Sequence, residues 1–391
     1  MMQPPAWVFL GCLAFCLYTL AGYPLLLALA ARFRGREVHR APLSPAVSVI
    51  LPVYNGERWI AAKLESILRL DYPAVLVEIL VVSDGSTDAT EQMVRRFAGR
   101  ARLRWIPLPR GGKAAALNAG IGSATGEVLF FTDVRQDLAP DSLARLVECL
   151  ADPSVGVVSG ELVIREGEGT EEANVGLYWK YEKWIRKAQS KIDSVAGATG
   201  CIYAMRRELA TPLPAGTLND DMYLPLAAFF RGYRVILEER ARAYDFPTQL
   251  ASEFRRKVRT LAGVYQIVGQ YPALLGPRNR MWVHFFSHKL ARLLMPWAML
   301  IALAASFGLP APWRGWTLAA QAAGYGLAAV DLFLPEGTAL KRLSSPARTF
   351  LTLMAASLCA VSYFFVPAAT LWGETRVAGA AKRRDGDAAQ S

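Results

Sequence analysis

The stretch VVSDGSTDAT, residues 81–90, indicates the fold class, because an apolar, β-branched run ends there in an acidic residue and a glycine. That run begins at residue 77, and a helical pattern follows over residues 88–97. The stretch VSVILPVYN, residues 47–55, has the same form and precedes a helical pattern over residues 57–70. Strands that are buried on both faces read as continuous apolar runs, so this alternation predicts a parallel sheet covered by helices.

The same alternation continues along the chain. Apolar runs at residues 103–107 and 128–132 flank a helical pattern at residues 113–121. In open α/β sheets, ligands bind at the carboxyl ends of the strands. Three polar residues follow the first, second and fourth predicted strands, namely Asn55, Asp84 and Asp133. The sequence therefore predicts a binding site at this edge of the sheet.

The N-terminal end of the chain predicts a transmembrane helix within residues 1–32. Trp7 to Ala31 is apolar and uncharged, and a span needs about 20 residues. The alternative is a cleaved signal peptide. It is disfavoured because no Lys or Arg precedes the stretch and the apolar part is too long. The arginine-rich segment that follows, up to Arg40, predicts that this end of the span is cytoplasmic.

Residues 288–373 predict further transmembrane helices, followed by a polar tail at residues 374–391. Three apolar segments are long enough to span a bilayer: Leu290–Leu309, Trp316–Leu334 and Phe350–Trp372. The basic loop Lys341–Arg348 is expected on the cytoplasmic side. Four crossings would place the tail outside, although it carries Lys382, Arg383 and Arg384, so one apolar segment could instead be re-entrant or interfacial.

Charge and composition narrow the function classes. The net charge is +11, and 53% of residues are hydrophobic. Many basic residues flank the apolar segments, which favours contact with acidic lipid headgroups, and no nucleic-acid-binding motif is present. The five cysteines form no CxxC pair, and His39, His284 and His288 have no ligand spacing. A reduced, cytosol-facing central domain is expected.

Two further stretches add chemistry to the predicted strand ends. In GGKAAALNAG, residues 111–120, glycines permit close backbone approach, while Lys113 and a helix N-terminus favour a diphosphate. GEVLFFTDVRQ, residues 126–136, places Asp133 at the end of an apolar strand. Asp84 could accept hydrogen bonds from a nucleoside, and Thr87 or Asp88 is expected to cap the next helix.

In this order, the four stretches resemble the family 2 glycosyltransferases. GATGCIYAMRR (197–207), NDDMYLPLAAFFRGYRV (219–235) and FRRKVRTLAGVYQ (254–266) resemble the acceptor half of membrane-bound members, which include the cellulose, chitin, hyaluronan and poly-N-acetylglucosamine synthases. The resemblance runs from about Val47 to Gln270. It implies an α/β fold of the glycosyltransferase A type, with a Rossmann-like nucleotide-sugar-binding domain at residues 45–270. The donor half would be residues 45–160 and the acceptor half residues 161–270.

The resemblance also implies roles for individual residues. Asp221 would be the general base, and Asp133 would bind Mg²⁺ or Mn²⁺. Donor-binding residues would be Pro52, Tyr54, Asn55, Asp84, Lys113, Asn118 and Asp133. Acceptor-binding residues would be Asp220, Arg256 and Arg259. Judged locally, Asp220 at a helix start is more often a cap, and Asp221 could simply be an acid favoured by the helix dipole.

The chain departs from the family pattern at two positions. Arg135 stands where a second metal-binding Asp is usual, so few protein ligands are expected for the metal. Thr260 stands where the acceptor motif has a Trp that stacks on the sugar, which favours short products or a single transfer. An aromatic group could compensate from the helical stripe of Tyr178, Trp179, Tyr181 and Trp184, although such a stripe could equally lie on a membrane surface.

Together with the resemblance, which alone implies that the reaction inverts the anomeric centre, these features predict a membrane-bound inverting glycosyltransferase in polysaccharide synthesis. Its donor would be a nucleotide sugar, with a UDP-sugar most expected, and its acceptor a glycan. One alternative is transfer of a single sugar to a polyprenyl-phosphate or other lipid-linked acceptor. Another, from a different class, is a non-catalytic membrane scaffold, which Arg135 favours. The predicted location is the bacterial inner membrane, with the catalytic domain cytoplasmic.

Overall fold

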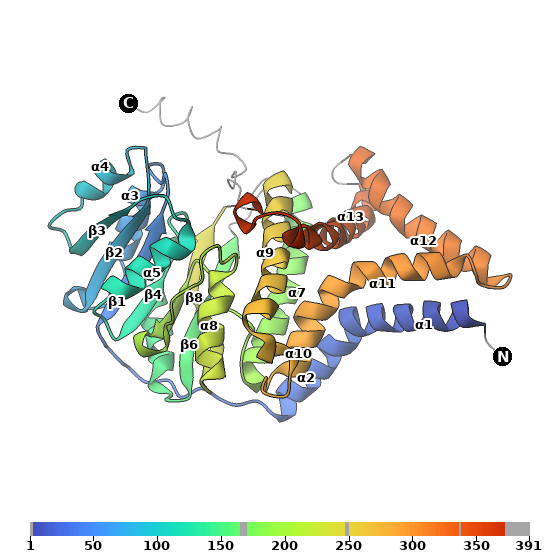
Figure 1. Cartoon of the computed structure of the whole chain (residues 1–391), viewed down its shortest axis with the longest axis horizontal. Coiled ribbons are helices and arrows are strands. Elements are labelled where there is room, and N and C mark those ends of the chain that lie inside the picture. The colour runs from blue at the N-terminus through green and yellow to red at the C-terminus, as the bar shows by residue number, and fades with distance from the viewer. Residues whose placement is uncertain (1–2, 165–169, 247–249, 336–337, 372–391) are drawn as a thin grey trace. The chain divides into compact units, whose positions relative to one another are not determined.

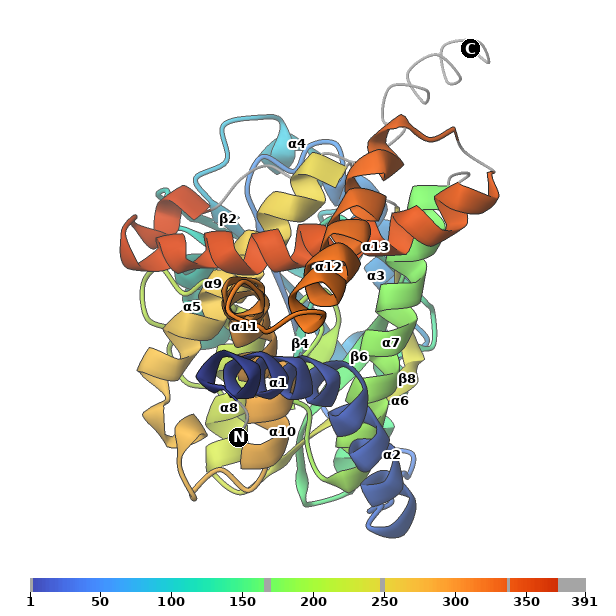
Figure 2. The same cartoon turned by 90° about the vertical axis from the view of Figure 1, so that its right-hand side faces the viewer.

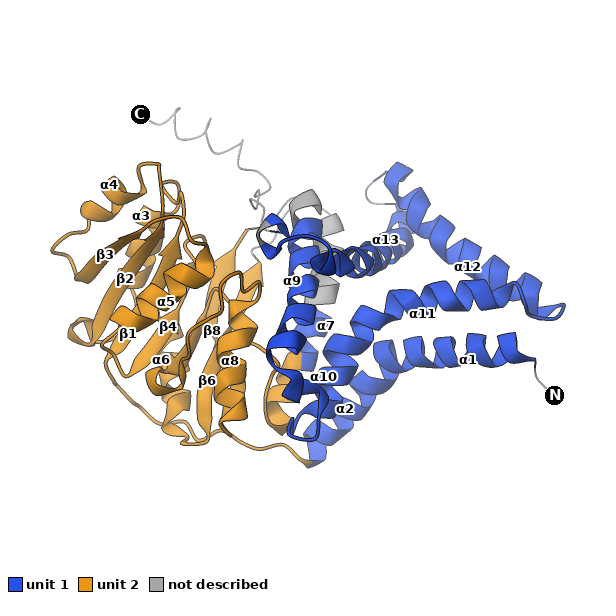
Figure 3. Ribbon diagram, viewed as in Figure 1, with its two compact units in different colours: residues 1–33, 166–185, 247–391 blue, residues 34–165, 186–246 orange. Residues whose placement is uncertain are grey.

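The computed structural model describes residues 3–164, 170–246, 250–335 and 338–371 (Figure 1). The chain divides into two compact units, which are coloured separately in Figure 3. Unit 1 comprises Met1–Phe33, Glu166–Ile185 and Pro247–Ser391, and unit 2 comprises Arg34–Arg165 and Arg186–Phe246. Each unit is built from segments that are distant in the sequence.

Unit 2 contains an eight-stranded sheet in the order β3-β2-β1-β4-β7-β6-β8-β5. The strands are β1 Val47–Val53, β2 Val77–Asp84, β3 Arg102–Leu108, β4 Val128–Phe131, β5 Asp137–Leu138, β6 Val155–Ile164, β7 Tyr203–Arg206 and β8 Arg234–Asp245. The first four strands are parallel, as predicted. β7 is antiparallel to both β4 and β6, β6 runs parallel to β8, and β5 is antiparallel to β8.

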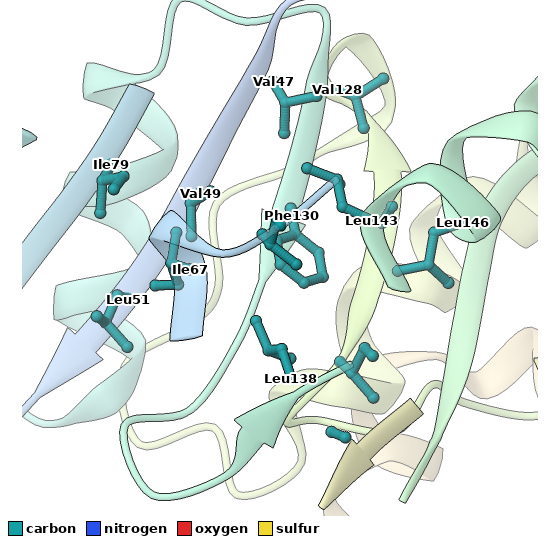
Figure 4. Close-up of a cluster of buried hydrophobic side chains, with 14 of the residues drawn as sticks. Val47, Val49, Leu51, Ile67, Ile79, Val128, Phe130, Leu138, Leu143 and Leu146 are labelled. Carbon is teal, nitrogen blue, oxygen red and sulfur yellow. The ribbon is translucent and has the colours of Figure 1, made fainter. Parts of the chain in front are cut away.

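The core of unit 2 forms on the face of the sheet that α3 (Ile60–Leu68) and α6 (Ser142–Glu148) cover. Every second residue of β1, such as Val49 and Leu51, points into this cluster, as Figure 4 shows. α5 (Lys113–Ser123) packs against β1 and β2. A Cβ on Gly120 of α5 would lie 2.8 Å from Cγ2 of Ile50, so only glycine permits this close approach.

Two helices of unit 2 begin later than predicted. α3 starts at Ile60 rather than at residue 57, and α4 (Thr90–Arg95) starts at Thr90 with Ala89 as its N-cap. The carboxylate of Asp88 still accepts the Thr90 N–H at 3.1 Å, and it also accepts the Glu57 N–H at 3.0 Å. Asp88 therefore connects two loops at the carboxyl edge of the sheet, and the helices α3 and α4 begin only after these loops. Unit 2 also contains α8, Asp220–Phe230, and the last part of α7 (Thr170–Ile192).

Unit 1 is helical. Its helices are α1 Pro4–Leu17, α2 Tyr23–Phe33, α9 Leu250–Gln270, α10 Trp282–Phe285, α11 Ala291–Ser306, α12 Trp313–Val330 and α13 Ala339–Cys359. π-helical turns at Tyr18–Gly22 and Phe286–Leu290 join α1 to α2 and α10 to α11. α1 runs beside α11 in Figure 1, and Figure 2 shows the two helices nearly end-on. The long helix α7, Thr170–Ile192, contributes its first part to unit 1.

Among the described residues, three continuous helices are long and apolar enough to cross a membrane: Pro4–Phe33, Trp282–Ser306 and Ala339–Phe364. The first agrees with the predicted N-terminal span, and the second begins earlier than expected. The span predicted at Trp316–Leu334 is a helix, α12, but it is not one of these three. The predicted tail at residues 374–391 lies outside the described residues.

The last candidate span differs most from the prediction, because the basic loop expected at Lys341–Arg348 is the first part of α13. The charged side chains in this part of α13 are paired with a buried acid. The carboxylate of Asp331, fully buried, lies 3.3 Å from Nζ of Lys341 and 3.2 Å from a guanidinium nitrogen of Arg348. Ser344 also donates to it at 2.6 Å. Paired charges can occupy positions that isolated charges cannot.

Candidate active site

The loops after β1 and β2 meet at the carboxyl edge of the sheet, as predicted. Asn55 adopts the left-handed conformation, with φ of 47°, and turns the chain sharply at the end of β1. Its side-chain oxygen accepts the Thr87 N–H at 2.9 Å, and its own N–H donates to the hydroxyl of Ser86 at 3.1 Å. Asn55 thus fixes the two loops together.

Asp84, at the end of β2, is buried and holds the glycine-rich loop. Oδ1 of Asp84 accepts the N–H groups of Gly111 at 2.7 Å and Gly112 at 2.8 Å, and Oδ2 forms an ion pair with Arg110. Both oxygens of Asp84 have partners within the protein in this conformation. The local reason is that Gly85, at φ of 70°, brings the Arg110 backbone against β2. A carboxylate has further lone pairs, so the expectation that Asp84 accepts a hydrogen bond from a nucleoside stays a prediction.

Arg110 forms a flat, exposed platform that the sequence did not reveal. Its guanidinium carbon lies 3.5 Å from the centroid of the Tyr54 ring, and it is also paired with Asp84. The Tyr54 side chain is half-exposed, and Pro52 lies just before it in β1. Stacked guanidinium and aromatic planes are suited to holding a planar ring. The only sequence signal was the position of Arg110 directly before the glycines of residues 111–112.

Lys113 joins two acids at the centre of the site. Its Nζ, at the start of α5, lies 3.0 Å from Oδ1 of Asp133 and 3.2 Å from Oδ2 of Asp220. Burial lowers the pKa of Lys113, but the charges of Asp133, Asp220 and Asp221 outweigh it and raise that pKa above its usual value. Lys113 therefore stays charged. Asp133 and Asp220 are more than 80 residues apart in the sequence, yet both contact this one ammonium group.

Asp221 has the properties of a base. Burial and the neighbouring charge of Asp220 raise the pKa of Asp221 to about 6, while Lys113 opposes the rise. The site also leaves little space, since a Cβ on Gly200 would lie 3.1 Å from Oδ2 of Asp221. The predicted capping role of Asp220 is wrong. Asn219 is the N-cap residue of α8, and the Asp220 carboxylate is turned to Lys113 instead.

One side chain of the site is suited to bind a divalent metal ion. Asp133 offers a hard carboxylate oxygen whose side chain is 36% exposed. Within the part of the chain that the structure describes, no three His, Cys, Asp or Glu side chains are grouped to hold an ion. Three carboxylates around a single lysine nevertheless leave an excess of negative charge. The site fits a divalent ion that is held by Asp133 together with an anionic ligand.

Arg135 pairs with an acid outside the group around Lys113. Its guanidinium lies 2.6 Å from Oδ2 of Asp245, at the end of β8, and Gln136 donates to the same oxygen at 2.7 Å. Lys63, which is buried in α3, donates to the Gln136 carbonyl at 2.7 Å. The segment after Asp133 is thus held from two sides. The missing second acid reflects the use of this position to anchor the loop.

The remaining predicted residues lie elsewhere. The amide of Asn118 donates to the Leu213 carbonyl at 2.9 Å and accepts the Leu213 N–H at 2.8 Å, so it holds the loop before α8. Arg256 and Arg259 belong to α9 of unit 1, where Arg256 pairs with Glu253 at 2.6 Å.

The predicted aromatic stripe is described only in part, because the side chains of Tyr178 and Trp179 lie outside the described residues. The Tyr181 hydroxyl donates to the Leu20 carbonyl at 2.9 Å, and the Trp184 side chain is exposed.

Comparisons with known proteins agree with this geometry. The family model described as glycosyl transferase family 2 matches residues 48–211, and that of glycosyl transferase family group 2 matches residues 136–372. An N-acetylglucosaminyltransferase of Rhizobium meliloti (strain 1021) is 33% identical over 217 residues, 51% of this chain and 50% of that protein. Glycosyltransferase GlyA of Streptococcus pneumoniae is 28% identical over 49% of this chain, which spans only 29% of that relative.

One solved structure is similar over nearly the whole chain. It is the mannosyltransferase PcManGT from Pyrobaculum calidifontis in complex with GDP-Man and Mn²⁺. Its sequence identity is 28%, its TM-score 0.72, and the match covers 92% of this chain and 99% of that chain. The similarity therefore extends beyond the sheet domain to the helical segments.

Proposed function

The chain belongs to the family 2 glycosyltransferases, and from that premise we propose that it is a membrane-bound, inverting enzyme that uses Asp221 as its general base. Its family establishes transfer of a sugar from a nucleotide-sugar donor. The observation that carries the proposal is the group of Asp133, Asp220 and Asp221 around Lys113 at the carboxyl edge of the sheet. This edge is where α/β folds bind their ligands.

Asp221 is suited to removing a proton from the acceptor hydroxyl. A base works best when its pKa lies near the working pH, and burial raises the pKa of Asp221 to about 6. The carboxylate is then mostly ionised at neutral pH, yet more basic than an ordinary aspartate. Attack by the activated hydroxyl on the face opposite the leaving diphosphate inverts the anomeric centre. An α-configured donor would give a β-linked product.

The donor would be held along the strand ends. Tyr54 and Arg110 would receive the nucleobase, and Pro52, Asn55 and Asp84 would shape that pocket. The N–H groups at the start of α5 and Lys113 would face the diphosphate. Asn118 would act indirectly, through the loop that it holds.

Mg²⁺ or Mn²⁺ would be held by Asp133 and the donor diphosphate. When bound, the ion would offset the negative charge that develops on the leaving group. PcManGT was solved with Mn²⁺, which supports the choice of ion. Since Asp133 is the protein ligand, we expect metal affinity to be weak until the nucleotide is present.

We propose a UDP-sugar donor, with UDP-N-acetylglucosamine as the first candidate, because several curated relatives are named N-acetylglucosaminyltransferases. The complex of PcManGT with GDP-Man makes GDP-mannose the second candidate. Membranes that contain the protein should be incubated with a panel of labelled nucleotide sugars. Incorporation from one donor identifies it, and incorporation from none of them would contradict the proposal.

The acceptor we propose is a growing polysaccharide chain. In unit 2, Asp220 would bind it beside the base, and Arg256 and Arg259 are the acceptor-binding candidates of unit 1. A specific observation favours a second candidate, which is one sugar added to a lipid-linked acceptor. Thr260, at the place of the stacking Trp, is exposed and its hydroxyl donates to the Arg256 carbonyl at 2.9 Å, so it offers no flat apolar face. Sizing the labelled product of the purified protein separates the two, because long chains would exclude single transfer.

The three helices long enough to cross a membrane support a location in the bacterial inner membrane. We propose that unit 2 faces the cytoplasm, because arginines follow the first span. Protease added to intact cells should leave unit 2 uncut, and cleavage within it from outside would contradict this orientation.

The central experiment is Asp221→Asn, with Asp141→Asn as its control. Asp141, directly before α6, has a half-exposed carboxylate that pairs with Arg145 at 3.1 Å. We expect Asp221→Asn to lower kcat by about 10²–10⁴-fold and to leave nucleotide binding intact. The control should retain full turnover. Near-normal transfer by Asp221→Asn would exclude Asp221 as the base. The alternative of a non-catalytic scaffold predicts that neither the wild type nor any variant transfers sugar.

A further inference from the structure

Tyr203 is a buried residue of the site that the proposed chemistry leaves without a role. It is the first residue of β7, and its ring stacks on Phe131 of β4 with centroids 4.5 Å apart and planes 10° apart. The side chain has no exposed surface. Among the residues that the structure describes, its hydroxyl has no hydrogen-bond partner.

A phenylalanine would fill this place at lower cost. A buried hydroxyl that is left unbonded destabilises the fold, whereas the ring alone supplies the stacking on Phe131. Unsatisfied polar groups in a folded core call for a specific explanation, such as a role in function. Stacking on Phe131 accounts for the ring of Tyr203, but the presence of its hydroxyl group needs a separate explanation.

The surroundings of Tyr203 point to the acids. The segment just before it lies against Asp221, since the Ala198 N–H donates to the Asp221 carbonyl at 2.7 Å and Gly200 leaves its carboxylate just enough room. Asp133 follows β4 two residues after Phe131. Burial and the charges of Asp220, Asp221 and Asp133 together raise the pKa of Tyr203 well above its usual value. Its hydroxyl therefore keeps its proton and is available to donate a hydrogen bond.

We propose that Tyr203 is a positioning residue for the general base. In the complex with donor and acceptor, its hydroxyl donates a hydrogen bond to one oxygen of the Asp221 carboxylate, so that the other oxygen faces the acceptor hydroxyl. The inference rests on the proposed role of Asp221. It explains why the protein keeps an unbonded hydroxyl in its core, because the group gains its partner only when the site is occupied and Asp221 is drawn into position.

The test is Tyr203→Phe, which removes a single oxygen. We expect kcat to fall by about 10- to 100-fold, as for the loss of one hydrogen bond to a charged group. KM for the donor should be unchanged, because Tyr203 acts on the base. The melting temperature of the detergent-purified protein should stay the same or rise, because the variant removes an unbonded polar atom from the core.

Tyr72→Phe is the matched control. The Tyr72 hydroxyl donates to the Pro45 carbonyl at 2.7 Å, beside the same core but without contact with the acids. Its loss should lower the melting temperature by about 2–4 °C and leave kcat unchanged. The two variants are thus expected to show opposite patterns.

The inference is overturned if Tyr203→Phe lowers the melting temperature as Tyr72→Phe does while kcat is retained, which is the result expected if a buried water bonds the hydroxyl for structural reasons. It is also overturned if KM for the donor rises and kcat stays constant. A separate failure, retained turnover in Asp221→Asn, would exclude the base itself. Loss of turnover in Asp221→Asn together with full turnover in Tyr203→Phe rejects only the role of Tyr203.

Discussion

Replacing Lys113 by Met should move the pH dependence of transfer, and the geometry of the site gives the direction. The ammonium group of Lys113 lies 3.0 Å from Asp133 and 3.2 Å from Asp220, and its charge lowers the pKa of Asp221. Lys113→Met removes that charge without greatly changing the volume of the side chain. The pKa of Asp221 must then rise above its present value of about 6.

The size of the shift follows from Coulomb's law. Unit charges 4–7 Å apart interact by about 2–4 kcal/mol at an effective dielectric constant of about 20. The Lys113 side chain keeps 23% of its surface exposed, and solvent screening reduces this to about 1–2 pKa units. A base acts only when it is deprotonated. The acidic limb of kcat should therefore move from about pH 6 to between about pH 7 and 8. Activity at pH 6.5 should then be about 4- to 25-fold lower than at pH 8.5, whereas a base with a pKa of about 6 gives a difference of only about 1.3-fold.

Stability gives a second, independent measurement of the same shift. The pKa of folded Asp221 lies above its ordinary value, so its contribution to stability is present at low pH and is lost as the pH rises through the folded pKa. A further rise in Lys113→Met should lower the free energy of unfolding at pH 8 by about 2 kcal/mol more than at pH 5.

Lys113→Arg retains the charge and is the control for both measurements. Its acidic limb should stay near that of the wild type, even if kcat changes because a guanidinium has another shape. An unchanged acidic limb in Lys113→Met would refute the reasoning, since it would mean that the titrating base does not feel the charge of Lys113.

Three further predictions concern the rest of unit 2. Arg110→Ala should weaken binding of the free nucleoside diphosphate by about ten-fold in calorimetry, because it removes the exposed platform and the partner of Asp84; unchanged affinity would place the nucleobase elsewhere. Excess chelator and Asp133→Ala should each abolish transfer, and full activity under either condition would contradict a metal held by this residue. Glu238 pairs with Arg240 and Arg40, which outweigh burial and lower its pKa to about 2, so it stabilises the fold above about pH 4.5 and this stabilisation is lost as the pH falls towards 2. Glu238→Gln should lower the free energy of unfolding at neutral pH by roughly 3 kcal/mol, measured by denaturant titration, and equal losses at pH 7 and pH 3 would contradict this.

The strands were more predictable than the helix ends, and the reason is physical. β1 lies where its apolar run predicted, at Val47–Val53, and β2 extends only to Asp84 beyond its predicted end. Burial on both faces makes each such run almost wholly apolar. Helix starts instead depend on which polar group accepts the first N–H. At Thr90 that acceptor is Asp88, whose carboxylate also accepts the N–H of Glu57 from another loop. A local sequence pattern does not predict such a contact between loops.

Non-local pairing limited the prediction of the site in the same way. The sequence indicated Lys113, Asp133 and Asp221 separately, but not that one ammonium group would join the acids. Arg110 was missed because an exposed arginine before two glycines follows no periodic pattern. The insertion of β7 between β4 and β6 was also not predictable, because it depends on pairing between segments about 75 residues apart in the sequence.

Arg135 distinguishes a working enzyme from a decayed one. Loss of a metal-binding acid from an abandoned site would be expected to leave its neighbours without compensation. Here the arginine at that position is matched by Asp245, which also accepts from Gln136, and both charges are largely buried. Breaking such a buried pair is costly, typically about 3–5 kcal/mol, so the two residues depend on each other. The substitution therefore reads as a different way of holding Asp133 in place. With Asp133 as the one protein ligand that we propose, the diphosphate would complete the coordination, which would couple metal binding to the arrival of the donor.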